Sequence, residues 1–222
     1  MSGLATGARP AELPRDSSFL PDAARRFLAV GGFPGVYAVG ETAALGGRRL
    51  ALFCSVRCPG EIILQTYDLA LALRSAGLTV VGGFHAPMER ECLDLLLRGR
   101  QPVVVCPARS IDGMRLPGAW RTPLSEVRLL VLSPFAPEQR RVTARLAKDR
   151  NRFVIALADE VLVAYATPGG RLEQLCREVV AQGKPSLTLA SAANRHLVEL
   201  GARAVTPESF GARGAAGADV AG

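Results

Sequence analysis

The triplet Arg150-Asn151-Arg152 is the part of the sequence whose residue types and spacing most clearly suggest chemistry. It precedes a strongly apolar run, residues 161–166, which leads to the glycine pair Gly169-Gly170 and a helix-like segment. A buried strand followed by a glycine turn and a helix start exposes backbone N–H groups to an anion. Arginine adds a planar, permanently charged guanidinium that matches the geometry of a phosphate. The pattern predicts a phosphate-binding edge of a parallel α/β sheet.

Further candidate binding residues follow two earlier apolar runs. Arg57 comes directly after residues 50–56, where a predicted strand meets the crevice of the sheet, although a solvated surface arginine fits the same position. Gly82 ends the next predicted strand and Gly83 follows it in a loop. His85 lies in the same loop, where it could hydrogen-bond a ligand. A single histidine without an adjacent nucleophile is weak support for catalysis, so we interpret the site as one that binds without a catalytic residue.

The arginine-rich region also has a purely structural interpretation. Arg152 could pair with a nearby carboxylate, such as Asp159 or Glu160, instead of a phosphate. The basic residues just before the triplet repeat at helical spacing, which is typical of a solvated face, or they could extend a basic groove for a nucleic-acid backbone. These residues are Arg140, Arg141, Arg145 and Lys148. Aromatic residues make up 5% of the chain, which favours backbone contacts over base stacking if nucleic acid binds.

Composition limits the class of protein. With 222 residues, 49% of them hydrophobic and 21% charged, the chain has the size and balance of one globular domain. A net charge of +7 favours an anionic partner, although a GC-rich genome explains the excess of arginine over lysine equally well. The five cysteines are odd in number, lie mostly in apolar runs and match no zinc-binding spacing. We therefore expect free thiols, no metal and no cofactor.

Both ends of the chain are rich in small residues, which predicts little order. The sequence thus divides into a disordered segment at 1–18, a single domain at 19–208 and a disordered tail at 209–222. Residues 1–16 lack the apolar core of a secretory signal, and no apolar run reaches membrane-spanning length. We therefore expect a cytoplasmic protein that does not contact a membrane.

Short apolar strands alternate with segments of helical periodicity from residue 49 onward. The predicted strands cover residues 50–56, 78–82, 102–106, 127–132, 161–166 and 186–189, with short strands at 36–39 and near 204–205. The predicted helices cover residues 19–30, 62–76, 88–98, 138–149, 172–182 and 194–200. This alternation predicts a Rossmann-like α/β fold, a mostly parallel sheet with helices on both faces. Ligands of such sheets bind at the carboxyl ends of the strands, here the loops at 55–61, 82–89, 107–117 and 167–171.

Several of these segments together resemble the DprA/Smf DNA-processing family. Residues 34–40, Pro-Gly-Val-Tyr-Ala-Val-Gly, and the strand that leads to Arg57 resemble its proline-tyrosine-glycine segment and its apolar strand ending in Gly-x-Arg. Residues 82–89, Gly-Gly-Phe-His-Ala-Pro-Met-Glu, lie where the family has Ser-Gly-x-Ala-x-Gly-Ile-Asp. Residues 150–158 are similar to its Arg-Asn-Arg-Ile-Ile-Ala-Gly-Leu-Ser signature, and Gly169-Gly170 falls at its Ser-Gly-Ser-Leu turn.

The resemblance covers residues 34–189 and departs from the family in two loops. Pro87 and Glu89 replace a glycine and an aspartate, and the segment Cys54-Ser55-Val56-Arg57 lacks the glycine before the arginine. Little chain remains for the flanking domains that many family members carry. The resemblance implies a divergent, core-only member with the Rossmann-like fold of the SLOG superfamily.

The resemblance also implies a function. The family binds single-stranded DNA and hands it to a recombinase during DNA-mediated transformation, and members of the superfamily often form homodimers. Transferred to this chain, phosphate contacts would come from three arginines and from the backbone of three glycines. These residues are Arg57, Arg150, Arg152, Gly83, Gly169 and Gly170.

Two alternatives use the same crevice. The segment that begins at Pro168-Gly169-Gly170 resembles the Pro-Gly-Gly signature of LOG phosphoribohydrolases, in which a Gly-Thr pair and a catalytic glutamate follow. The Gly-Thr pair is absent here, so Glu173 falls at a different spacing, and an acidic residue in the first turn of a helix is favourable for electrostatic reasons alone. The second alternative is a carrier or sensor of a small nucleotide-derived ligand.

Overall fold

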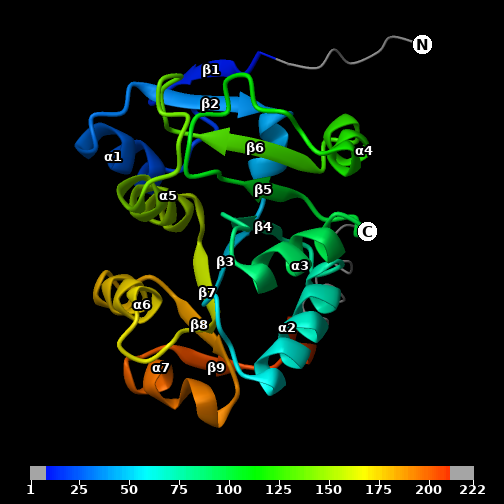
Figure 1. Cartoon of the computed structure of the whole chain (residues 1–222), viewed down its shortest axis with the longest axis vertical. Helices are drawn as coiled ribbons and strands as arrows, with labels where there is room; N and C mark the ends of the chain where they lie inside the picture. Colours follow the sequence, from blue (N-terminus) through cyan, green and yellow to red (C-terminus); the bar gives the residue numbers. More distant parts are fainter. Residues whose placement is uncertain (1–8, 211–222) are drawn as a thin grey trace, which may run out of the picture.

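One nine-stranded sheet runs through the domain in the strand order β1-β2-β6-β5-β4-β3-β7-β8-β9 (Figure 1). The computed structural model describes residues 9–210 of the chain. The strands are β1 (Ala11–Pro14), β2 (Gly35–Val39), β3 (Arg49–Cys54), β4 (Thr79–Gly82), β5 (Val103–Val105), β6 (Leu129–Ser133), β7 (Glu160–Tyr165), β8 (Ser186–Leu189) and β9 (Arg203–Val205). All neighbours from β6 across to β9 are parallel, whereas β2 runs antiparallel to both β6 and β1.

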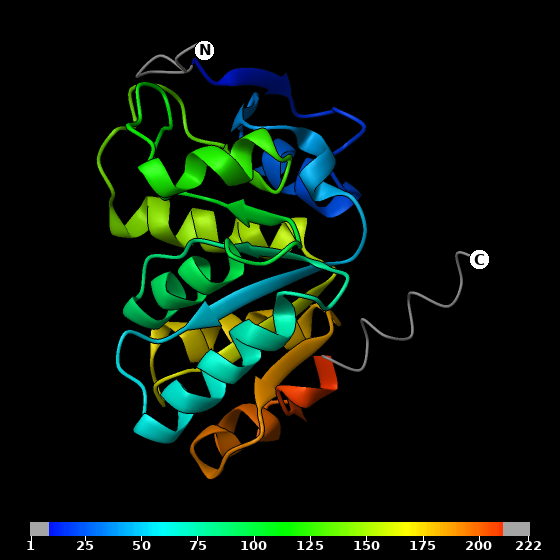
Figure 2. The same ribbon diagram turned by 90° about the vertical axis from the view of Figure 1, so that its right-hand side faces the viewer.

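Helices cover both faces of the sheet (Figures 1 and 2). One face carries α1 (Asp22–Val30), α5 (Ala144–Leu157), α6 (Arg171–Ala181) and α7 (Arg195–Glu199), and the other carries α2 (Gly60–Leu73), α3 (Pro87–Leu96) and α4 (Arg121–Ser125). Successive residues of a strand point to opposite faces. Ala51 and Phe53 of β3 accordingly join the apolar cluster under α5, and Leu50 and Leu52 join the cluster under α2. The expected α/β fold with a mostly parallel sheet is confirmed.

The strand order changes direction at β3. Strands β4, β5 and β6 follow on one side of β3, and β7, β8 and β9 follow on the other. Because α2 after β3 and α6 after β7 cover opposite faces, the loops at the carboxyl ends of these two strands diverge. A crevice opens at such a point in sheets of this type, and it is the usual ligand site. The fold therefore directs attention to the loops after β3 and β7.

Helix α5 differs from the sequence-based prediction at both ends. Predicted at residues 138–149, it begins at Ala144, where the Thr143 hydroxyl caps it by accepting the N–H of Leu146 at 3.2 Å, and it runs to residue 157. The polar triplet at 150–152 interrupts the apolar periodicity, so the sequence pattern does not predict that the helix continues to residue 157. Arg150 takes the buried position one turn after Leu146, where an apolar residue is usual. The triplet consequently lies inside a helix and does not lead directly into a strand.

The ends of the domain also differ from the prediction. Residues 9–18 fall in a segment for which the sequence predicts little order, yet Ala11–Pro14 form β1 and pair with β2. At the other end Phe210 is fully buried, although it falls in the predicted tail. The remaining parts of these predictions, residues 1–8 and 211–222, lie outside the described residues. None of the helices within residues 9–210 is long and apolar enough to cross a membrane.

Asp159 and Arg49 join the starts of β7 and β3. The backbone N–H of Arg49 donates to Asp159 Oδ2 at 2.8 Å, and Arg49 Nη2 donates to Oδ1 at 2.7 Å. Burial raises the pKa of Asp159, but the hydrogen bonds from Arg49 outweigh this effect and leave the pKa below its usual value. A carboxyl group with a lowered pKa in the folded state stabilises the fold above its unfolded pKa and loses this contribution as the pH falls.

We therefore expect Asp159→Asn to unfold at a lower urea concentration than the wild type at neutral pH. The difference should shrink as the pH falls below about 4, because the wild-type carboxyl group then becomes protonated as well. Urea titrations at a series of pH values measure this. A difference that does not change with pH would show that the charge of Asp159 contributes nothing.

Candidate anion-binding site

A cavity of about 660 Å³ lies at the carboxyl ends of β3 and β7, where the strand order changes direction. Its walls are the end of β3 and the following loop, the loop after β4, one side of α5 and the first turn of α6. We call this cavity the switch-point groove. Five of the sequence-predicted site residues line it. These are Arg57, His85, Arg150, Asn151 and Gly170, whereas Gly82, Gly83, Arg152 and Gly169 do not line it.

Arg150 is the buried cation of the groove. Its residue surface is 3% exposed, Nε donates to Oδ1 of Asn151 at 2.8 Å, and Nη1 donates to the carbonyl oxygen of Cys106 at 3.3 Å. Burial lowers the pKa of Arg150 and the nearby Glu89 carboxylate raises it, yet a guanidinium remains charged at any physiological pH. Within residues 9–210, Arg150 forms no ion pair. Because Glu89 is not within ion-pair distance, an anion in the groove could contact the guanidinium directly and offset the cost of burying it.

Gly83 makes room for this guanidinium. A Cβ atom built on Gly83 would lie 1.4 Å from Nη1 and 2.0 Å from Cζ of Arg150. No side chain other than hydrogen is therefore compatible with this position of Arg150. The sequence predicts Gly83 as a backbone donor to a phosphate, whereas the structure assigns it a steric role next to Arg150.

Glu89 ties two loops of the groove together, and sequence reasoning did not select it. It is 5% exposed, and its carboxylate accepts the backbone N–H groups of Cys54 at 3.1 Å, His85 at 3.0 Å and Ala86 at 3.3 Å. The signal that could have identified it is Pro87 in the first turn of a helix with an acid two positions later, a common helix start. Glu89 thereby joins the end of β3 to the loop after β4.

Three more cations stand at the groove. Arg57, Lys148 and Arg171 are exposed, line the groove and form no ion pair within the described chain. Lys148 precedes Arg150 on α5, and Arg171 is the first residue of α6. Sequence reasoning selected Arg57, considered Lys148 only as part of a basic face, and missed Arg171. Together with Arg150 they make the groove a site of positive charge.

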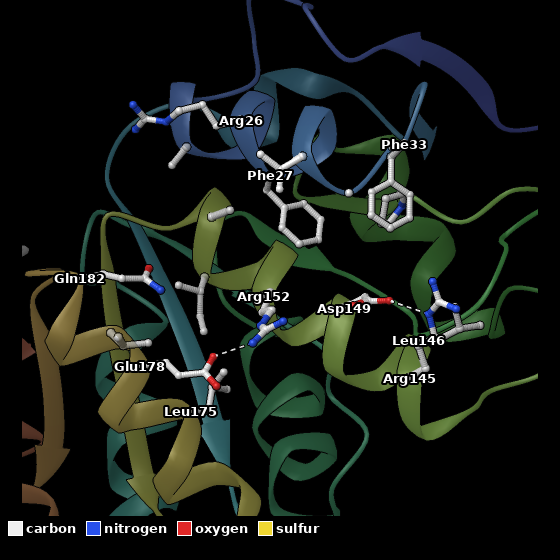
Figure 3. A pocket seen from close by; sticks show the side chains of 18 of the residues that line it. Arg26, Phe27, Phe33, Arg145, Leu146, Asp149, Arg152, Leu175, Glu178 and Gln182 are labelled. Atoms are coloured by element: carbon white, nitrogen blue, oxygen red, sulfur yellow. Dashed lines mark hydrogen bonds and ion pairs between the residues drawn. The ribbon is translucent and has the colours of Figure 1, made fainter.

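Arg152 faces away from this groove. Two residues along a helix correspond to a rotation of about 200°, so Arg150 and Arg152 lie on opposite sides of α5. Arg152 Nη2 pairs with Oε2 of Glu178 on α6 at 3.0 Å (Figure 3). The two acids that sequence reasoning considered for this pairing belong to other arginines, Asp159 to Arg49 and Glu160 to Arg48. Arg152 therefore does pair with a carboxylate, but with Glu178 and not with Asp159 or Glu160.

The glycine turn before α6 uses its own N–H groups. Gly169, at φ +70°, donates its N–H to Oε2 of Glu173 at 2.6 Å, and Gly170 donates to the carbonyl oxygen of Thr167 at 2.9 Å. Both donors that the sequence assigns to a phosphate are thus bonded within the turn. The N–H of Thr167 donates to Oγ of Ser55 at 3.0 Å, which ties the loop after β7 to the loop after β3.

Glu173 is likewise engaged within α6. Its second oxygen, Oε1, accepts Nη2 of Arg177 at 3.1 Å, and the residue does not line the groove. All five cysteines are free thiols, and burial raises the pKa of Cys106 and of Cys92 to about 12. Within residues 9–210 no group of three His, Cys, Asp or Glu side chains is arranged to hold a metal ion.

The sequence matches no family model and no curated protein, but the structure has clear neighbours. DNA processing protein A (DprA) from Streptococcus pneumoniae superposes with a TM-score of 0.75 at 16% identity, covering 92% of this chain and 74% of that chain. DprA from Helicobacter pylori, described for its single-stranded DNA binding mode, gives 0.68 at 20% identity, covering 90% and 93%. The molybdenum cofactor carrier protein of Chlamydomonas reinhardtii gives 0.51 at 11% identity, covering 79% and 100%. The chain has a DprA-like fold.

Proposed function

We propose that this protein binds single-stranded DNA in the switch-point groove, chiefly through contacts to phosphate groups. The observation that carries the proposal is Arg150, a buried guanidinium that lines the groove and forms no ion pair within the described chain. A phosphate presents oxygen atoms that a guanidinium can bind with two parallel hydrogen bonds. The DprA-like fold supports the choice of DNA, because one solved DprA is described as binding single strands.

The residues around Arg150 would make different contacts with the bound strand. Arg57, Lys148 and Arg171 lie at exposed positions, where they can contact successive phosphates and release the counterions of the strand. Asn151 holds Arg150 through Nε and so orients the guanidinium, and His85 offers a ring nitrogen to a base or a sugar. Phosphate contacts carry no sequence information, so the proposed binding tolerates any sequence.

The test is fluorescence anisotropy of a labelled oligo-dT of about six nucleotides over a salt series. Four cations that each neutralise one phosphate of a single strand predict a slope of log affinity against log salt of about −3. The double variant Lys148→Gln, Arg171→Gln should reduce the steepness by about 1.4, because two of these contacts are lost.

The matched control is Arg121→Gln, Arg203→Gln, which removes the same charge from exposed positions outside the groove. The control should keep the wild-type slope. If the wild type does not bind at low salt, or if the control loses as much affinity as the groove variant, the proposal is wrong.

A small nucleotide-derived ligand is the second candidate. The cavity volume of about 660 Å³ lies in the range of small-molecule sites, and one structural neighbour is a cofactor carrier. An ultraviolet-absorbing compound that copurifies with the protein and competes with oligo-dT would favour this candidate. The hydrolase alternative receives no support from Glu173, whose two carboxylate oxygens are both bonded within its own helix and turn.

The DprA-like fold also supports a proposal about the pathway in which the protein acts. We propose that the bound strand belongs to DNA uptake or recombination, that a recombinase receives it, and that the protein works as a homodimer. Each of these statements depends on single-strand binding and would fall with it.

A further inference from the structure

A second cavity, of about 820 Å³, lies between α1, α5 and α6 on the other side of α5 (Figure 3). We call it the α1–α5–α6 groove. One side of α5 faces this groove with Arg145, Asp149 and Arg152. The other side of the helix faces the switch-point groove with Lys148 and Asn151. Helix α5 is therefore a ridge with a groove on either side.

The α1–α5–α6 groove combines exposed cations with an aromatic wall. Arg145 has a side chain that is 90% exposed and only a distant carboxylate, Asp149 Oδ2 at 3.9 Å, and Arg26 is exposed without an ion pair within residues 9–210. Phe27 and Phe33 stack on each other with ring centroids 5.6 Å apart and planes at 19°, and both are only partly buried. Exposed guanidinium groups beside aromatic rings are the features with which proteins bind single-stranded nucleic acid.

Not every cation of this groove is available. Lys184 donates its Nζ to the carbonyl oxygens of Ile155 and Ala158, both at 2.6 Å, and so caps the end of α5. Arg152 pairs with Glu178, an exposed pair of the kind that contributes little to stability and can exchange partners. The cations that remain accessible are Arg26, which forms no ion pair within residues 9–210, and Arg145, which has only the distant Asp149 carboxylate.

The two grooves adjoin each other between α5 and α6. Leu175 and Glu178 of α6 line both of them, and the Arg152–Glu178 ion pair lies at their junction. Eight basic side chains line the two grooves together, against three acidic ones. The basic residues are Arg26, Arg57, Arg145, Lys148, Arg150, Arg152, Arg171 and Lys184, and the acidic residues are Glu89, Asp149 and Glu178.

We infer that a single strand bound in the switch-point groove continues between α5 and α6 into the α1–α5–α6 groove. There its phosphates meet Arg145 and Arg26, beside the partly buried Phe27–Phe33 pair. The inference rests on the proposed function, since it concerns the path of the same strand. A short oligonucleotide fills the switch-point groove alone, and a longer one occupies both grooves.

The experiment compares oligo-dT of about six nucleotides, near the lower end of the usual site sizes of single-strand-binding modules, with oligo-dT of about twenty, beyond their upper end. The variant is Arg26→Gln, Arg145→Gln, and the control is again Arg121→Gln, Arg203→Gln. The variant should bind the short probe like the wild type. For the long probe it should lose roughly tenfold in affinity, and its salt slope should be less steep by about 1.4.

Thermal unfolding shows whether the variant is intact, which we expect because Arg26 and Arg145 are both exposed. An unchanged affinity for the long probe, with the short probe still bound, overturns the strand path and leaves the proposed function standing. The groove would then be free for a protein partner. Failure of the wild type to bind the short probe overturns the proposed function itself.

Discussion

Replacing Gly83 by alanine should abolish high-affinity oligo-dT binding while leaving the fold intact. The new Cβ would lie 1.4 Å from Nη1 of Arg150, so the guanidinium must leave its place. The backbone itself does not resist the change, because Gly83 is not among the residues with positive φ. The guanidinium is the far end of a flexible side chain, so it moves at little cost to the fold. We expect an affinity loss of roughly a hundredfold, about 2.7 kcal/mol, as for a lost charge-assisted contact.

Two further variants make this result specific. Gly60→Ala adds the same methyl group where no atom lies within 4 Å, and it should bind like the wild type. Arg150→Gln should show the same loss as Gly83→Ala, and the double variant should lose no more than either alone, because both changes remove one interaction. Additive losses would mean that Gly83 acts on binding by another route, such as a direct backbone contact to the strand.

Replacing Glu89 by alanine should lower the free energy of unfolding by about 3 kcal/mol. The carboxylate accepts three backbone N–H groups, from Cys54, His85 and Ala86, and two of these hydrogen bonds are buried. Donors left without an acceptor in a buried site cost about 1–3 kcal/mol each, and water that enters the space recovers part of that cost. Urea unfolding measures the change.

Glu91→Ala is the matched control, since Glu91 is exposed on the same helix and the hydrogen bond that it accepts from Tyr67 is exposed as well. It should change stability by no more than about 0.5 kcal/mol. Glu89→Gln keeps one carbonyl oxygen as an acceptor, so its loss in free energy of unfolding should lie between those of Glu89→Ala and Glu91→Ala. Equal stability of the Glu89 and Glu91 alanine variants would show that the loops after β3 and β4 do not depend on the carboxylate.

The sheet could be read from the sequence because its strands are short, apolar and separated by helical segments. Strands β3 to β8 all lie within two residues of their predicted bounds, since each is a run of buried side chains that water cannot solvate favourably. Helix α5 could not be read in the same way, because its buried face includes an arginine. Strand β1 was missed because an edge strand with exposed side chains has no apolar pattern.

The candidate site was predictable only as a region. Sequence reading identified four loops, because parallel sheets bind ligands at that edge. The loops after β3, β4 and β7 line the groove, whereas no residue of the fourth, at 107–117, does. Sequence reading did not show that Arg150 lies in the groove and Arg152 on the opposite side of α5. The predicted helix ended at residue 149, so neither arginine was placed on a helix face. Glu89 was missed for another reason: the Pro87 and Glu89 pattern indicates only a helix start, and it does not show that the same carboxylate also accepts the N–H of Cys54 at the end of β3. Contact of these residues with a ligand remains a prediction.

The cross-links between the loops of the switch-point groove have a consequence for the rate and entropy of binding. Glu89 holds the loops after β3 and β4 together, and the Ser55 hydroxyl holds the loop after β7. Loops that are already ordered lose little conformational freedom when a ligand arrives. If a single strand binds as proposed, the ordering cost would fall on the strand. Its encounter with the positively charged groove would then need no slow rearrangement of the protein.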